Sequence, residues 1–133
     1  MVTQKNKLNI PSSWPGSIPE FLVYNSLTTT FGMTDGIEFT YQSSFMGGRL
    51  DKGGMVVDFV FNNPPDLAVN VQGVYYHYEF GVESKARDMM ARASLAGQNI
   101  TLIFIDDDDL MRDRMYYCRE ALNYQDHSRL GGG

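Results

Sequence analysis

The sequence predicts a mixed α/β fold of the α+β kind, in which a small mixed β-sheet of about four strands is flanked by helices. Apolar residues recur at helical spacing in three segments and in strand-like runs in four. These segments follow one another as helix, three strands, helix, strand and helix. The three consecutive strands allow an antiparallel meander, and the strand–helix–strand segment allows one parallel crossover. A chain of 133 residues fits one domain with a single core.

The first helix is expected over residues 17–31. Ser17 is a candidate N-cap, and Glu20 follows three residues later, which is the spacing of a capping box. Gly32 is expected to end this helix. Its apolar stripe consists of Phe21, Leu22, Tyr24, Leu27 and Phe31.

Three strands are expected next, at 37–45, 55–61 and 67–74, because each run contains β-branched or aromatic residues. Residues 46–54 form a glycine-rich turn that carries two basic residues. Residues 62–66, with the sequence NNPPD, form the turn between the second and third strands.

The second half of the chain contains a helix at 83–97, a strand at 100–105 and a last helix that ends at Leu122. The strand is continuously apolar, so we expect it to be central in the sheet and covered on both faces. The acidic run 106–109 lies between this strand and the last helix. Acidic residues in that place favour a helix N-terminus, and the alternating ligands of a calcium loop are missing.

The chain is interpreted as three parts. Residues 1–16 are expected to form an extended basic arm, residues 17–124 the folded domain, and residues 125–133 a flexible tail. No apolar run approaches the roughly 20 residues that a membrane-spanning helix needs, so no membrane partner is expected. The start of the chain lacks the apolar middle of a signal peptide, which favours a cytoplasmic location. Cys118 is the single cysteine and excludes an internal disulfide.

The net charge of −5 counts against nucleic-acid binding, because phosphate neutralisation supplies much of the affinity of such proteins. The distribution of charge matters more than its sum, however. Three small basic groups stand apart from the acidic run. They consist of Lys5 and Lys7, of Arg49 and Lys52, and of Lys85, Arg87 and Arg92.

Asp58 lies within an otherwise apolar strand, where a carboxylate is costly to bury unless it is paired, hydrogen-bonded or bound to a cation. It could hold a backbone amide or an arginine as a purely structural residue. Strand alternation puts Asn70 and Gln72 on one face of the next strand, and a hairpin would bring that face beside Asp58. Oxygen donors that converge in this way suit a hard cation such as Mg²⁺, although the two amides could equally bond to each other.

Two further polar residues follow along the chain. His77 stands among tyrosines and could be an aromatic packing element or a proton acceptor near neutrality. Asp88 lies on the next helix, where it could pair with Arg92 at i+4 or take part in a site.

Together, Glu20, Asp58, a variable position at Gln72, His77 and Asp88 form an order that resembles the EDxHD nucleases. This group includes relatives of the very short patch repair endonucleases and the catalytic domain of a phage-intron homing endonuclease, all within the PD-(D/E)XK superfamily. The resemblance covers roughly residues 17–122 and implies the superfamily's α-β-β-β-α-β core. The superfamily usually carries E-x-K on its third strand, whereas the matching positions here are Gln72 and Val74.

The resemblance implies metal-assisted hydrolysis of DNA, with Mg²⁺ or Mn²⁺ as the cofactor. Asp58 would hold the metal, with Glu20 and Gln72 as further ligands. His77 would accept the proton of the attacking water or assist the leaving group, and Asp88 would orient it. Phosphate contacts are expected from Arg49, Lys52, Lys85, Arg87 and Arg92.

A second hypothesis keeps the fold without the chemistry. The acidic balance, Gln72 and the missing lysine favour a catalytically reduced module that acts as a structural or interaction component. It would belong to a phage-like particle or a larger nucleoprotein assembly. A homo-oligomer is also possible, and a fold by itself does not decide between these functions.

Overall fold

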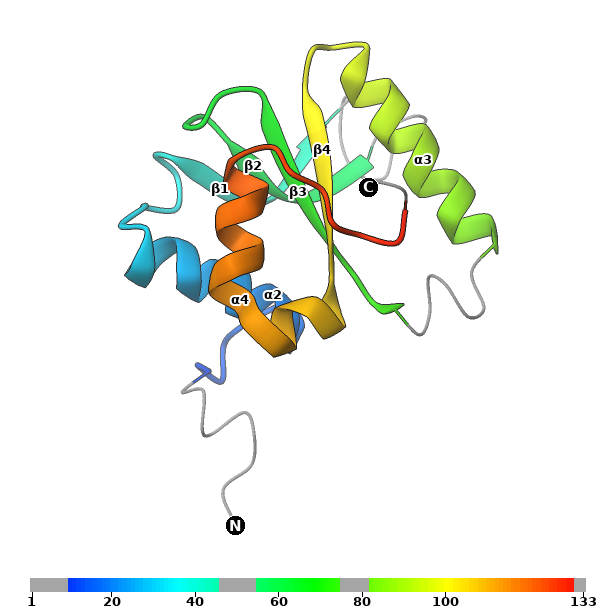
Figure 1. The fold of residues 1–133 in the computed structure, drawn as a ribbon. Helices are drawn as coiled ribbons and strands as arrows, with labels where there is room; N and C mark the ends of the chain where they lie inside the picture. Colours follow the sequence, from blue (N-terminus) through cyan, green and yellow to red (C-terminus); the bar gives the residue numbers. More distant parts are fainter. Residues whose placement is uncertain (1–9, 46–54, 75–81, 131–133) are drawn as a thin grey trace.

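The computed structural model describes residues 10–45, 55–74 and 82–130 of the chain, and Figure 1 shows how their helices and strands are arranged. The elements in chain order are α2 (Ile18–Asn25), the π-helix η1 (Ser26–Thr30), β1 (Phe39–Phe45), β2 (Met55–Phe61), β3 (Leu67–Gln72), α3 (Val82–Ala96), β4 (Thr101–Asp106) and α4 (Asp107–Leu122). None of the helices in these ranges has the length and apolar content that crossing a membrane requires.

The four strands form one mixed sheet in the order β1-β2-β3-β4. β1 pairs antiparallel with β2, and β2 pairs antiparallel with β3, so the meander is confirmed. β3 and β4 run parallel, with Leu67 opposite Thr101 and Gln72 opposite Asp106. The helix α3 connects these two strands, which confirms the parallel crossover and the mixed α/β fold class.

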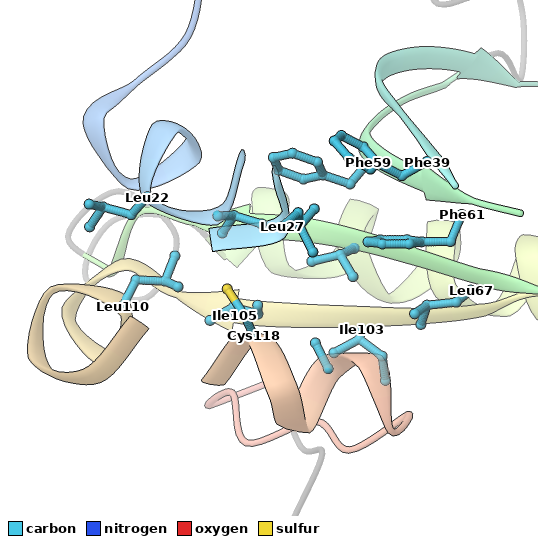
Figure 2. Packing of buried hydrophobic residues seen from close by; sticks show 13 residues of the cluster. Leu22, Leu27, Phe39, Phe59, Phe61, Leu67, Ile103, Ile105, Leu110 and Cys118 are labelled. Atoms are coloured by element: carbon cyan, nitrogen blue, oxygen red, sulfur yellow. The ribbon is translucent and has the colours of Figure 1, made fainter. Parts of the chain in front are cut away.

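The helices cover the two faces of the sheet and divide its core into two clusters. The larger cluster joins α2, η1 and α4 to one face, and Figure 2 shows its helical residues Leu22, Leu27, Leu110 and Cys118 together with strand residues such as Phe59 and Ile105. The smaller cluster lies on the α3 side and contains Leu95 together with Leu102, Phe104 and Leu130. Burial of these apolar side chains is the main force that holds the layers together.

The first helix begins as expected but does not continue regularly to Gly32. The Ser17 hydroxyl accepts a hydrogen bond from the Glu20 amide at 3.2 Å, which confirms the N-cap. The last turn, Ser26–Thr30, is a π-helix. The Thr28 and Thr29 hydroxyls donate to the carbonyls of Tyr24 and Asn25, and such bonds compete with the regular helical pattern.

β4 lies at the edge of the sheet, so the expectation of a central strand was wrong. Its apolar residues are buried on both faces by the helices, and that burial does not require a strand neighbour on both sides. The outer edge is covered by residues 126–130, which pass along β4 in Figure 1. Part of the segment expected to be a flexible tail is therefore held against the domain, with Leu130 only 6% exposed.

Candidate functional site

At Asp58, the backbone hydrogen bonds between β2 and β3 give way to hydrogen bonds that involve side chains. The two strands pair regularly from Phe61–Leu67 to Phe59–Val69. At the next position the Asp58 amide donates to Oδ1 of Asn70, and the Val71 amide donates to Oδ2 of Asp58, both at 2.8 Å. Side chains thus replace backbone acceptors at this point, and Asp58 does hold a backbone amide.

The same position marks an irregularity in the sheet. Residues two apart on a strand normally share a face, yet Val57 packs in the α3-side cluster and Phe59 in the opposite cluster. On β1, Gln42 lies between the pairs Tyr41–Phe59 and Ser43–Val57 and has a φ of 57°. This left-handed conformation is uncommon for a residue other than glycine. Asp58 therefore lies at the point where the alternation of β2 between the two faces of the sheet is broken.

Glu20, Tyr41 and Asp58 form one electrostatic group contributed by α2, β1 and β2. The Tyr41 hydroxyl donates to Oε1 of Glu20. Burial and the charge of Glu20 raise the pKa of Asp58 to about 7, against the opposing effect of the Val71 amide. Burial, the hydrogen bond to Glu20 and the charges of Glu20 and Asp58 raise the pKa of Tyr41. Within the described ranges, no basic side chain contributes to the shifted pKa of Asp58.

Gln72 and Asp88 form a second pair on the α3 side of the sheet. Gln72 is 2% exposed, and its Nε2 donates to Oδ2 of Asp88 at 2.9 Å. The alternative partner considered for Asp88 was Arg92, which forms an ion pair with Asp126 at 3.2 Å. Asp88 is therefore engaged with the strand that carries the predicted site, although through Gln72.

The predicted phosphate contacts are distributed unevenly. Arg92 is built into the fold, because it also donates to the Leu130 carbonyl at 3.3 Å and stacks over the Phe104 ring. Lys85 is half-buried and Arg87 exposed on α3. His77, Arg49 and Lys52 lie outside the described residues.

A separate group of carboxylates lies where β4 meets α4. Oxygen atoms of Asp106, Asp108 and Asp109 lie within 4.8 Å of one another and could hold a metal ion. Asp106 is buried, whereas the side chain of Asp108 is 44% exposed. The acidic run begins α4 as expected, with Asp107, Asp108 and Asp109 in its first turn.

Two arginines already compensate this acidic group. Arg129 forms ion pairs with Asp106 at 3.0 Å and with Asp108 at 2.6 Å, and the hydrogen bond from Arg129 lowers the pKa of Asp108. Arg112 pairs with Asp109 at 2.6 Å. The run therefore anchors the C-terminal segment as well as starting a helix. The sequence clue to this anchoring was Arg129, a basic residue in the segment that was interpreted as a tail.

Comparisons with models of known protein families, with curated proteins and with solved structures find no match. Of the site predicted from the sequence, Glu20 and Asp58 come together as one group, and Gln72 and Asp88 as another. Asn70 lies beside Asp58, as strand alternation predicted, whereas Tyr41 is a participant that the sequence did not assign.

Proposed function

We propose that this protein is a metal-dependent endonuclease or nickase that hydrolyses phosphodiester bonds in DNA. The observation that carries the proposal is that the carboxylates of Glu20 and Asp58, from a helix and a strand far apart in sequence, lie close enough for Glu20 to raise the pKa of Asp58. Among the described residues, no basic side chain lowers that pKa. Burial and the nearby charge of Glu20 make the ionised form of Asp58 unfavourable. A bound divalent cation would offset this effect. The helix, meander and crossover also agree with the core expected from the nuclease resemblance.

The donor atoms fit a hard cation such as Mg²⁺ or Mn²⁺, which prefers oxygen ligands. Glu20 and Asp58 would hold it, whereas Gln72, the third ligand predicted from the sequence, pairs with Asp88 on the α3 side of the sheet. A metal bound there supplies Lewis-acid polarisation of a phosphate and a lower pKa for a coordinated water.

The remaining roles belong to the side chains of the chain itself. His77 is proposed to take the proton of the attacking water, which is a task for a group that titrates near neutrality. Lys85 and Arg87 would neutralise phosphates and position the strand without reading its sequence. Asp88 would act on the site through its bond to Gln72.

The hydrogen bonds that Asp58 makes with β3 favour a second function, that of a structural or interaction component. The Asp58 carboxylate accepts a hydrogen bond from the Val71 amide, and Gln72 donates one to Asp88. Both residues therefore also stabilise the sheet and its contact with α3. A module without chemistry would retain these bonds for stability alone. It would then use its surface, which includes the exposed Met89 and Met90 of α3, as a component of a larger assembly.

A plasmid-nicking assay distinguishes these two functions. Supercoiled DNA is incubated with the native chain in Mg²⁺ and in Mn²⁺ over a series of salt concentrations. We expect cleavage by the native chain and a loss of about 100-fold or more in rate for both Asp58→Asn and His77→Ala, the scale of a lost general base or metal-site residue. Asp66→Asn is the matched control, because it removes the same charge from an exposed turn.

The control variant should cleave like the native chain. Absence of cleavage by the native chain in both metals, at every salt concentration, contradicts the endonuclease proposal and favours the assembly component. Equal rates for native, Asp58→Asn and His77→Ala would show that any observed cleavage arises elsewhere.

A further inference from the structure

An aromatic group holds the Glu20 side of the site in place. The Trp14 ring stacks on the Tyr41 ring with 4.8 Å between centroids and an interplanar angle of 22°. Trp14 also meets the Phe21 ring edge-on at 5.1 Å, and its Nε1 donates to the Ser17 carbonyl at 3.0 Å. The chain that precedes α2 is thus fixed over the helix N-terminus and against β1.

Two hydrogen bonds fix the orientation of the Tyr41 hydroxyl. It donates to Oε1 of Glu20 and accepts from Nε2 of Gln42 at 3.1 Å. The Tyr41 ring lies 5.0 Å from the ring of Phe59, the residue next to Asp58. A phenol held by packing and by a second hydrogen bond loses little further freedom when it binds a carboxylate, and hydrogen bonds to ionised groups are the stronger ones.

Gly16 packs against one side of the hydrogen-bonded pair formed by Glu20 and Tyr41. A Cβ atom added to Gly16 would overlap both the Tyr41 hydroxyl and Oε1 of Glu20. The backbone of Gly16 therefore lies directly against the two oxygen atoms. A ligand cannot reach Oε1 from that side, so we expect a cation to bind Glu20 through Oε2.

Asp58 likewise uses one of its two oxygens within the protein, because its Oδ2 accepts a hydrogen bond from the Val71 amide at 2.8 Å. Among the described residues, each of the two carboxylates thus has one oxygen that accepts a hydrogen bond from the protein and a second oxygen that does not. Mg²⁺ and similar small ions need near-octahedral geometry with single oxygens at short distance, whereas Ca²⁺ takes more oxygens and often both of one carboxylate. The arrangement favours the small ion.

We propose that Tyr41 is a positioning residue that sets the metal selectivity of the Glu20–Asp58 site. Its hydroxyl occupies one oxygen of Glu20, so that this carboxylate offers a single ligand atom and the site discriminates against Ca²⁺. The inference rests on the proposed metal site, but it concerns binding and can be tested without DNA.

The test measures Mn²⁺ and Ca²⁺ binding to the full chain by isothermal titration calorimetry. The native chain is expected to bind Mn²⁺ more tightly than Ca²⁺. Tyr41→Phe keeps the ring and removes the hydroxyl, and we expect it to weaken Mn²⁺ binding about tenfold, the scale of a lost outer partner of a metal ligand. Ca²⁺ binding should be unchanged or tighter, so the preference between the two ions shifts towards Ca²⁺.

Tyr24→Phe is the matched control, because Tyr24 belongs to the same aromatic group and interacts with Asp35 instead. It should leave both affinities unchanged. Gly16→Ala provides a second test, since the added methyl group must displace the Glu20–Tyr41 pair and is expected to weaken Mn²⁺ binding.

The outcomes separate the two proposals. Mn²⁺ binding by the native chain with an unchanged Mn²⁺-to-Ca²⁺ preference in Tyr41→Phe overturns the role of Tyr41 and leaves the metal site intact. A loss of both affinities in equal proportion also contradicts the selectivity role. No binding of either ion by the native chain overturns the metal site, and the role of Tyr41 with it.

Discussion

Asp58→Asn is expected to stabilise the protein at pH 8, by up to about 4 kcal/mol, while it removes metal binding. The reason is that the charged form of Asp58 is unfavourable in the folded state. Burial and the Glu20 charge raise the pKa of this group from 3.8 to about 7. Each pKa unit corresponds to about 1.4 kcal/mol. Asparagine retains an oxygen for the Val71 amide and carries no charge.

The sign of the pH dependence follows from proton binding in the two states. Between about pH 4 and pH 7 the folded chain keeps the Asp58 proton and the unfolded chain has released it, so this group lowers stability as the pH rises. Above about pH 7 its full cost is present, and below about pH 4 it vanishes. Native and Asp58→Asn chains should therefore be equally stable at pH 4 and differ most at pH 8.

Urea unfolding at pH 4, 6 and 8 in the presence of a chelator measures this difference. Asp66→Asn removes an exposed carboxylate and should follow the native chain within about 0.5 kcal/mol at each pH. With Mn²⁺ at about 100 times its Kd, the native chain should gain about 2.7 kcal/mol and Asp58→Asn nothing. A variant that is less stable than the native chain at pH 8 would show that the Asp58 charge is favourable, and it would remove the electrostatic support for a cation site.

The elements of the fold could be predicted because their apolar patterns are long and periodic. The strand 55–61 and the order of pairing agree with the structure. The position of β4 could not be predicted, since helices on both faces and residues 126–130 along its edge bury it as fully as a neighbouring strand would. The π-helix depends on hydroxyl-to-carbonyl bonds of threonines, which apolar periodicity does not report.

The candidate site was predictable where a polar residue violates an apolar pattern. Asp58 stood out in its strand for that reason, and Glu20 through the spacing of a helix cap. Tyr41 gave no such signal, because a tyrosine in a strand is ordinary and its bond to Glu20 joins residues 21 positions apart. The partner of Gln72 was missed because Asp88 had a plausible local partner in Arg92.

Asp126 is expected to be a main anchor of the C-terminal segment, although composition suggested a tail. Its Oδ2 accepts the Phe104 amide at 2.9 Å and pairs with Arg92 at 3.2 Å. Its Oδ1 accepts from the amide and the hydroxyl of Ser128. The side chain is 9% exposed. It therefore occupies the outer edge of β4 where another strand could otherwise pair, and a covered edge is a protection against aggregation.

Asp126→Ala should lower the free energy of unfolding by about 3 kcal/mol, because it leaves the Phe104 amide without this acceptor and the Arg92 charge without this partner. Asp108→Ala is the control, since it removes an exposed carboxylate paired with Arg129, and exposed pairs contribute about 1 kcal/mol or less. Urea unfolding measures both. Hydrogen exchange should also show faster exchange at Phe104 in Asp126→Ala alone. Equal losses for the two variants, or an unchanged exchange rate at Phe104, would contradict an anchoring role and would mean that Leu130 and Arg129 hold the edge without it.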